Sequence, residues 1–260
     1  MHRAAPSLEV ASTGVCFMQS RILQATILAI GVSVCAAATA HAAISADEQK
    51  RLNDAAGVVT ALRAQSDGIP DEYWNKAQCV VVIPDMKKAA FIFGGEFGRG
   101  VMSCRNGSSW SAPVFMRLEK GSWGFQAGAE EIDLVLLVMN RDAAAKMLNS
   151  KVSLGADASI AAGPVGRSAG ASTNGNLSAE VLSYSRAHGV FAGINLSGGA
   201  LRADDNSNKD AYGTMTASDV VLNNKGNAPK EASTFINTLR AGARATTGTS
   251  TPAATDTTKY

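Results

Sequence analysis

Apolar residues recur at helical spacing along residues 45–65. Leu52, Val59 and Leu62 fall on one side of such a helix, and polar residues occupy the other side. The segment opens with Ser45-Ala-Asp-Glu48, the pattern of a capping box. We therefore predict an amphipathic helix. Its apolar face either contacts lipid or packs on a sheet, and the lack of Trp and Phe on that face favours packing.

The hydrophobic period changes to two after residue 78. The β-branched run Cys79–Ile83 predicts a strand that ends in a turn at Pro84-Asp85, and strands are expected again at Ala89–Gly94 and Gly100–Cys104. Further strands are predicted at 114–119, 123–127, 132–139, 152–162, 179–186 and 190–196, and further helices at 70–74, 140–148 and 229–244. This order predicts an α+β fold: a mainly antiparallel, curved or barrel-like sheet with an N-terminal amphipathic helix and a C-terminal helix.

Glycine is concentrated in the predicted strands. Seventeen of the 25 glycines lie between Gly94 and Gly199. Because glycine weakens a strand, this density predicts bulges, barrel corners or places where two backbones approach closely.

The N-terminal segment has the pattern of a secretory signal. Residues 22–34 form an apolar run that is too short to span a bilayer, and Ala40-His41-Ala42 is a small-x-small cleavage site. We predict a signal peptide over residues 1–42, with Met18 as an alternative start, and export to the periplasm. A lipoprotein attached through Cys35 and an uncleaved anchor are the alternatives. The bulky valine before that cysteine disfavours lipoprotein processing.

The charge of the chain is nearly balanced, and few residues suited to catalysis remain in its mature part. It has 24 basic and 22 acidic residues, whereas nucleic-acid binding needs a clearly basic domain, so we expect no nucleic-acid partner. Without residues 1–42 the chain keeps a single histidine, His188, and two cysteines. A zinc site of three or four such ligands would have to use all of them together, and an enzyme with a histidine base would have to use His188. We expect no metal, no cofactor and no catalytic residue, and interpret His188 as a turn residue.

The two remaining cysteines, Cys79 and Cys104, have two interpretations. In an oxidising periplasm they form a disulfide that closes a loop of about 25 residues and adds roughly 3 kcal/mol of stability. Alternatively, they are separate buried thiols in the sheet. We expect the disulfide, within a single domain over residues 43–245. The Thr/Ala-rich residues 246–260 are predicted to be a disordered tail.

Several motifs resemble those of the SYLF domain, also called the Ysc84-like domain. They follow the order of that family and cover about residues 45–240. The motifs are Val80-Val-Val-Ile-Pro84, Lys88-Ala-Ala-Phe-Ile-Phe-Gly-Gly95, Gly98-Arg-Gly100, Trp110-Ser-Ala-Pro113, Gly124-Phe-Gln-Ala-Gly128, Leu154-Gly-Ala-Asp-Ala-Ser159, Ala162-Gly-Pro-Val-Gly-Arg167, Leu182-Ser-Tyr-Ser-Arg186 and Gly189-Val-Phe-Ala-Gly193. Together with the signal segment, they identify the chain as a member of this family, of the exported bacterial kind.

The resemblance implies a lipid-binding module rather than an enzyme. Eukaryotic relatives bind phosphoinositide membranes, with an amphipathic N-terminal helix and basic surface residues implicated, and fungal relatives also bind actin. In this chain the helix at residues 45–65 is only mildly basic, so phosphoinositide specificity is not carried over. A bacterial envelope contains no actin, so we expect no actin partner.

Four cations are candidates for contact with anionic headgroups. Lys87 and Lys88 follow a predicted turn and Arg99 lies in a predicted hairpin, so a shared rim would form a small cationic patch. The alternative is that they are ordinary solvated turn charges. Arg167 lies among small residues, where it either binds a ligand or holds backbone carbonyls or Asp157.

The sequence therefore predicts a non-catalytic lipid-binding protein of the periplasm, with an anionic phospholipid or a membrane surface as its partner. The predicted lipid-contacting residues are Lys87, Lys88, Arg99, Arg167, Leu52, Val59 and Leu62. The alternative is a structural or protein-interaction module of the cell envelope without lipid affinity. An enzyme would need a carboxylate pair such as Glu130 and Glu131, but adjacent residues of a strand point to opposite faces.

Overall fold

The computed structural model describes residues 44–65, 68–91, 93–123, 128–164, 178–187, 190–191 and 195–244. Within these ranges, the description leaves out the side chains of residues 88–94, 122–130, 190–191 and 242–244. The predictions for the signal segment 1–42, for Arg167, for His188 and for the tail 246–260 fall outside the described residues.

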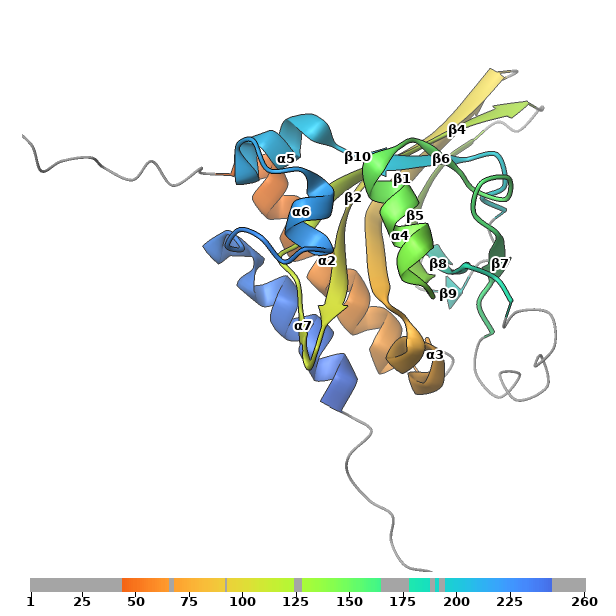
Figure 1. Ribbon diagram of the computed structural model, residues 1–260. Coiled ribbons are helices and arrows are strands. Elements are labelled where there is room, and N and C mark those ends of the chain that lie inside the picture. The colour runs from red at the N-terminus through yellow and green to blue at the C-terminus, as the bar shows by residue number, and fades with distance from the viewer. Residues whose placement is uncertain are drawn as a thin grey trace, which may run out of the picture. The chain divides into compact units, whose positions relative to one another are not determined.

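The described chain forms a curled, mostly antiparallel half-barrel sheet with helices packed on it (Figure 1). The strands are β1 (Cys79–Phe91), β2 (Phe93–Asn106), β3 (Ser109–Trp110), β4 (Val114–Trp123), β5 (Gly128–Val138), β6 (Val152–Ser153), β7 (Ile160–Ala162), β8 (Val181–Ala187), β9 (Val190–Phe191) and β10 (Ala200–Ala203). The helices are α2 (Ala46–Ala64), α3 (Asp71–Lys76), α4 (Arg141–Asn149), α5 (Asp205–Tyr212), α6 (Ala217–Val221), the short 3-10 helix η2 (Lys230–Ala232) and α7 (Ser233–Arg244). The predicted α+β fold, with a helix at each end, is confirmed.

The strand order places the longest strands in the middle of the sheet. It runs β6-β10-β4-β2-β1-β5-β8-β7, with β3 paired to β2 and β9 to β8. Among the described strands, β7 and β8 pair in parallel and the other pairs are antiparallel. Helices α2 and α7 lie side by side (Figure 1), and α2 packs on the central strands β1 and β2.

Helix α2 begins with the predicted capping box. Glu48 Oε2 accepts a hydrogen bond from the Ser45 backbone N–H at 2.7 Å, and Ser45 Oγ accepts one from the Glu48 N–H at 3.3 Å. The apolar face of the helix is buried, including Leu52, Val59 and Leu62. The apolar face therefore packs on the sheet and does not face solvent, so these three side chains offer no exposed surface to lipid.

Strand β1 does not end at Pro84-Asp85, where the sequence pattern predicted a turn. It continues to Phe91 through a bulge, at which the register shifts against both neighbouring strands. Pro84 has no N–H to donate and Asp85 has a positive φ of 48°, and a bulge accommodates both properties. The predicted turn was wrong because turns and bulges use the same residue types. Lys87 and Arg99 consequently lie inside strands β1 and β2 and not on turns.

Two glycines of β2 lie against this bulge. A Cβ atom at Gly98 would lie 2.4 Å from Ile83 Cγ2, and one at Gly100 would lie 2.1 Å from the carbonyl oxygen of Val82. Glycine therefore lets β2 approach β1 closely here, which is one of the reasons predicted for the density of glycine in the strands.

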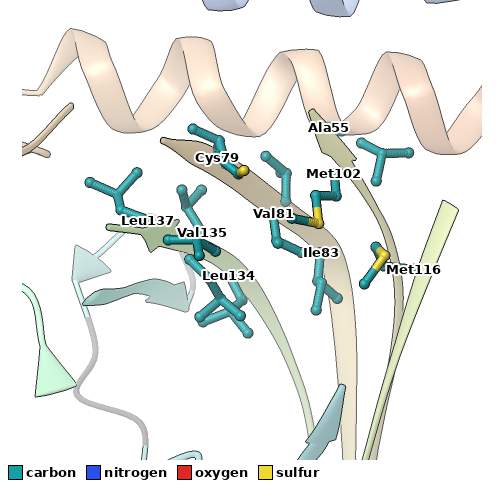
Figure 2. Close-up of a cluster of buried hydrophobic side chains, with 14 of the residues drawn as sticks. Ala55, Cys79, Val81, Ile83, Met102, Met116, Leu134, Val135 and Leu137 are labelled. Atoms are coloured by element: carbon teal, nitrogen blue, oxygen red, sulfur yellow. The ribbon is translucent and has the colours of Figure 1, made fainter. Parts of the chain in front are cut away.

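The predicted disulfide is present and lies in the core. Cys79 and Cys104 are directly opposite each other on β1 and β2, and both are buried. Figure 2 shows Cys79 beneath the helix, among the aliphatic and methionine side chains that fill the space between helix and sheet. The disulfide thus joins the two strands that carry the bulge and Arg99 in their middle parts.

The residues between 199 and 222 form elements for which the sequence analysis predicted neither a helix nor a strand. These elements are β10, then α5 and α6, and the polar run from Asp204 to Asn208 lies at the start of α5. Asn208 holds this helix against β4 through two hydrogen bonds. Its Oδ1 accepts from the Phe115 N–H at 2.7 Å, and its Nδ2 donates to the Phe115 carbonyl at 2.9 Å. Tertiary contacts of this kind stabilise a segment whose intrinsic helix propensity is low. The strand predicted at 152–162 is likewise interrupted, by a turn between β6 and β7.

Candidate functional site

A cleft of about 330 Å³ lies between helix α2 and the bulge of β1. Its volume is at the lower end of the range found for small-molecule sites. The lining is mostly charged, with both signs represented. It consists of Asp47, Lys50, Arg51 and Asp54 from α2, Pro84, Asp85 and Lys87 from β1, and Phe97, Gly98 and Arg99 from β2.

The helical wall of the cleft is a charged stripe. Asp47, Lys50, Arg51 and Asp54 follow at positions i, i+3, i+4 and i+7, so they share one side of α2. Lys50 Nζ donates to Asp54 Oδ2 at 2.5 Å, and Arg51 Nη2 donates to Asp47 Oδ2 at 3.1 Å. The sequence analysis missed this stripe because it followed the apolar residues of the helix, although the same helical spacing identifies the polar face.

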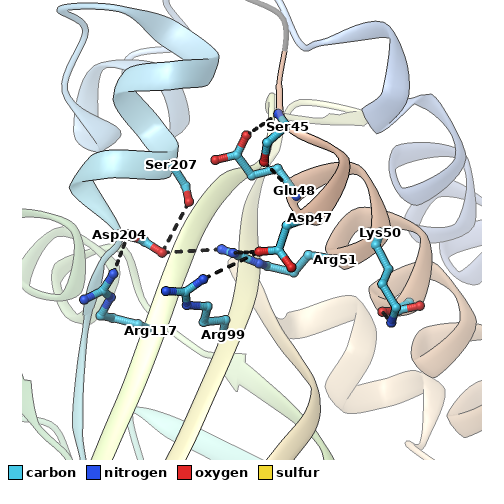
Figure 3. A network of polar contacts seen from close by, with 10 residues as sticks. Ser45, Asp47, Glu48, Lys50, Arg51, Arg99, Arg117, Asp204 and Ser207 are labelled. Carbon is cyan, nitrogen blue, oxygen red and sulfur yellow. Dashed lines mark hydrogen bonds and ion pairs between the residues drawn. The ribbon is translucent and has the colours of Figure 1, made fainter.

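A buried ion-pair network supports this wall (Figure 3). The Asp204 carboxylate, which is 2% exposed, accepts from Arg51 Nη1 at 3.4 Å and from Arg117 Nη2 at 2.8 Å. Ser207 Oγ lies 3.3 Å from the same carboxylate, and the Arg51 guanidinium lies over the Phe115 ring at 5.2 Å. The network joins α2, β4 and the start of α5, so it holds the helical wall of the cleft against the sheet.

Arg99 lies at the Asp47 end of the cleft. Its Nη1 is 3.5 Å from Asp47 Oδ2, and its guanidinium lies 5.8 Å from the centroid of the Phe97 ring. The strand register places it in one row with Arg117 and Arg202, on β4 and β10. Each arginine of this row has an acidic partner, namely Asp47, Asp204 and Glu119, respectively. The row is therefore largely neutralised within the protein.

Asp85 carries a weakly compensated charge at the other end of the cleft. Its backbone N–H donates to Asp133 Oδ1 at 3.3 Å, but none of the described side chains makes an ion pair or hydrogen bond with its carboxylate. Burial raises the pKa of Asp85, and the negative charges of Asp133, Asp54 and Glu131 raise it further, whereas Lys50 lowers it. The electrostatic surroundings of this carboxylate are therefore predominantly negative.

This surplus of negative charge predicts a pH-dependent stability. Because the pKa of Asp85 is higher in the folded protein than in the unfolded chain, the free energy of unfolding falls as the pH rises from the unfolded to the folded pKa. We expect Asp85→Asn to raise the thermal midpoint at neutral pH. That gain should disappear below the ordinary aspartate pKa of about 3.9, where both variants are uncharged at this position.

Thermal unfolding of the two proteins across this pH range measures the effect. Asp210→Asn, which changes an exposed aspartate at the end of α5, is the control and should show no pH-dependent gain. A lower midpoint for Asp85→Asn at neutral pH would contradict the prediction.

Lys87 and Phe97 are direct partners on β1 and β2, and both line the cleft. The nearest described anion to Lys87 Nζ is Glu131 Oε1 at 3.9 Å, a distance that leaves the ammonium weakly paired. Phe97 is 43% exposed although it lies inside a long strand. An aromatic ring and a weakly paired cation thus lie side by side beside the cleft.

The structure brings together only part of the predicted site. Lys87 and Arg99 were predicted to share one surface, and both line the cleft. They lie within strands β1 and β2, however, and not on the turns that the sequence pattern predicted. Lys88 lies opposite Glu96 on β2 and Glu130 on β5, and its side chain is not among those that the structure describes. The residues that sequence reasoning missed are Asp47, Lys50, Arg51, Asp54, Asp85 and Phe97.

The curled sheet, its helices and the charged cleft at the bulge define an α+β half-barrel domain with a charged surface cleft. Residues 119–242 match the family described as Ysc84, Las17-binding protein actin regulator. The chain belongs to this family, also called the SYLF family. Protein YSC84 of Saccharomyces cerevisiae is 31% identical over 180 residues, which cover 67% of this chain and 38% of that protein.

Two further relatives show the same partial overlap. LAS seventeen-binding protein 3 of Saccharomyces cerevisiae is 29% identical over 179 residues, covering 67% of this chain and 39% of that protein. SH3 domain-containing YSC84-like protein 1 of Xenopus laevis is 32% identical over 148 residues, covering 56% and 44%. This chain thus spans about two fifths of the length of these curated relatives. In the part of the chain that the structure describes, each helix is too short or too polar to cross a membrane.

Proposed function

We propose that this protein is a non-catalytic lipid-binding protein that docks on phospholipid surfaces through the cleft and the residues beside it. The observation that carries the proposal is the exposed ring of Phe97, which lies next to the weakly paired Lys87 and in contact with Arg99. An exposed aromatic ring with neighbouring cations suits the interface of a bilayer, where the ring enters the headgroup region and the cations face phosphates.

Electrostatic attraction adds to this contact only moderately. A cation near an anionic membrane contributes about 1 kcal/mol, and Lys87 and Arg99 are the exposed cations of the cleft beside Phe97. The acidic residues of the cleft oppose a purely anionic surface. We therefore expect binding that depends on both the aromatic residue and the cations, with a partial sensitivity to salt.

The proposed place of action is the periplasm. The signal-like segment at residues 1–42 supports export, and the Cys79–Cys104 disulfide is consistent with an oxidising compartment. In this proposal residues 43–245 form one Ysc84 domain that meets the membrane peripherally.

A second candidate function is protein interaction. The name of one yeast relative refers to binding of a protein called LAS seventeen, and the family description refers to Las17 binding and actin regulation. A surface with an exposed aromatic residue and charges of both signs also suits a protein partner. In that case the cell envelope would supply a stable protein partner, and lipid affinity would be absent.

Phe97→Ala is expected to weaken binding to vesicles by about fivefold to tenfold, because a partly exposed phenylalanine loses roughly 1 kcal/mol or more of apolar contact with the bilayer. Co-sedimentation with vesicles of phosphatidylethanolamine, phosphatidylglycerol and cardiolipin measures the change. Met215→Ala is the matched control, since Met215 is 37% exposed and does not line the cleft. Failure of the unmodified protein to sediment with any of these vesicles would rule out the lipid-binding proposal and favour the protein-interaction function.

A further inference from the structure

The charged residues of the cleft form two groups at separated positions along α2. Arg99 is tied to Asp47 near the start of α2, and Asp85 interacts with Asp54 seven residues further along the same helix. Seven residues of helix correspond to about 10 Å along its axis. A ligand that spans the cleft therefore meets the Arg99–Asp47 pair near one end. Near the other end it meets the Lys50–Asp54 pair and the Asp85 carboxylate, which has no described partner.

The carboxylate end is suited to a cation. Asp54 and Asp85 line the cleft there, and Asp133 and Glu131 lie close enough to add to the negative potential at Asp85. The Lys50 ammonium already donates to Asp54, which shows that a primary ammonium fits this wall. The Asp85 carboxylate is reached by no described ion pair, so it is the acceptor that a ligand can use.

A metal ion does not match this end of the cleft. Among the described residues, no group of three or more His, Cys, Asp or Glu side chains has the arrangement to hold one. A quaternary ammonium has no N–H to donate to a carboxylate and is usually bound by a cage of aromatic rings. The described lining contains one aromatic residue, Phe97. A primary ammonium, which has three N–H donors, is the cation that suits two carboxylates.

The other end of the cleft is suited to a phosphodiester. Arg99 has a planar guanidinium that matches phosphate oxygens. Lys87, on the neighbouring strand, adds a second positive charge, which lies between Phe97 on β2 and the exposed Glu131 on β5, 3.9 Å from the Glu131 carboxylate. Lys87 lies two residues from Asp85 on β1, a separation of roughly 6–7 Å between Cα atoms. Such a spacing suits a ligand in which a short linker separates the ammonium from the phosphate.

We propose that the cleft recognises a phosphoethanolamine group, with its primary ammonium on Asp85 and Asp54 and its phosphodiester on Lys87 and Arg99. This inference rests on the proposed lipid-binding function and names the headgroup that the protein prefers. The same chemistry occurs in phosphatidylethanolamine and in soluble glycerophosphoethanolamine. Bound at this site, the ammonium offsets the repulsion among the carboxylates around Asp85, and Phe97 lies where the glycerol and acyl part of a lipid would follow.

The test compares three headgroups in two forms with the purified protein. Vesicles of phosphatidylcholine alone, or with added phosphatidylethanolamine or phosphatidylglycerol, are used in co-sedimentation, and the corresponding soluble glycerophosphodiesters are titrated in NMR experiments. We expect the ethanolamine form to bind best in both series. Asp85→Asn should reduce the preference for ethanolamine over choline by about tenfold.

Matched variants separate the two ends of the ligand. Lys87→Ala should weaken all three headgroups, whereas Lys230→Ala, which removes an exposed lysine 3.9 Å from its nearest described carboxylate, should weaken none. Asp210→Asn is the corresponding control for Asp85→Asn and should keep the ethanolamine preference.

Each outcome decides a different claim. Vesicle binding without an ethanolamine preference, or a preference that survives in Asp85→Asn, would overturn the headgroup inference and leave the lipid-binding proposal standing. Binding of glycerophosphoethanolamine without any vesicle binding would keep the recognition of phosphoethanolamine but assign it to a soluble ligand. Absence of binding in both series would overturn both claims.

Discussion

Replacement of Asp204 by alanine is expected to lower the free energy of unfolding by about 3 kcal/mol or more, since this is the usual cost of removing one partner from a buried ion pair. The Asp204 carboxylate accepts from Arg51 and Arg117, which are 6% and 20% exposed. Alanine would leave both guanidinium groups with little water to replace the lost acceptor. Arg51 keeps its contact with Asp47, which limits the loss. Urea-induced unfolding measures the change.

Controls distinguish this effect from a general cost of substitution in α5. Asp210→Ala alters an exposed aspartate of the same helix and should change the unfolding free energy by no more than about 0.5 kcal/mol. In a double-mutant cycle, Arg117→Ala should cost less in the Asp204→Ala protein than in the unmodified one. Independent, additive effects of the two substitutions would show that the ion pair does not stabilise the fold.

Loss of the Cys79–Cys104 disulfide is expected to lower the free energy of unfolding by about 3–3.5 kcal/mol, because the bond closes a loop of 25 residues in the unfolded chain. The bond is buried, so a reductant reaches it only after the chain unfolds. Urea unfolding of protein refolded with and without dithiothreitol measures the difference, and a thiol assay verifies reduction.

The variant with Cys79→Ala and Cys104→Ala provides the control for this comparison. Its stability should be low and should not respond to the reductant. Equal unfolding free energies for the oxidised and the fully reduced protein would contradict the prediction. The disulfide joins β1 and β2 at the end opposite to the hairpin, so its loss should also loosen the strands that carry Lys87 and Arg99.

These two predictions concern the frame that holds the cleft. The Asp204 network fixes α2 to the sheet, and the disulfide fixes the two strands on which the bulge and Phe97 lie. By contrast, Asp85 opposes stability at neutral pH, since burial and neighbouring carboxylates disfavour its charged form. A residue that destabilises the free protein and faces a cleft is what the proposed ligand-binding role would produce.

Local signals were sufficient for much of the fold. The capping box at Ser45 and Glu48 predicted the start of α2, because its two hydrogen bonds are made within one helical turn. The apolar run at 132–139 predicted a strand, and β5 covers most of it, with both faces buried from Leu134 to Val138. Local signals were misleading at Pro84-Asp85, where the same residues suit a turn and a bulge.

The candidate site was predicted less well than the fold. Lys87 and Arg99 were identified as cations on one surface, but the proposed reason, adjacent turns, was wrong, because both lie within strands. Phe97 and Asp85 gave no signal in the sequence, since neither an exposed aromatic residue nor an unpaired carboxylate can be recognised without the neighbours that leave it so.

By itself, the sequence determined the amphipathic helix, the alternating strands, the two cysteines available for pairing and the family, because periodicity, capping and motif order are properties of neighbouring residues. Only the tertiary structure decided the cleft. The ion pair between Arg51 and Asp204 joins residues 153 positions apart, and the bulge brings Asp85 to face a helix that precedes it in the chain. Such contacts depend on strand register and on the packing of α2, and neither is encoded in any local stretch of the chain.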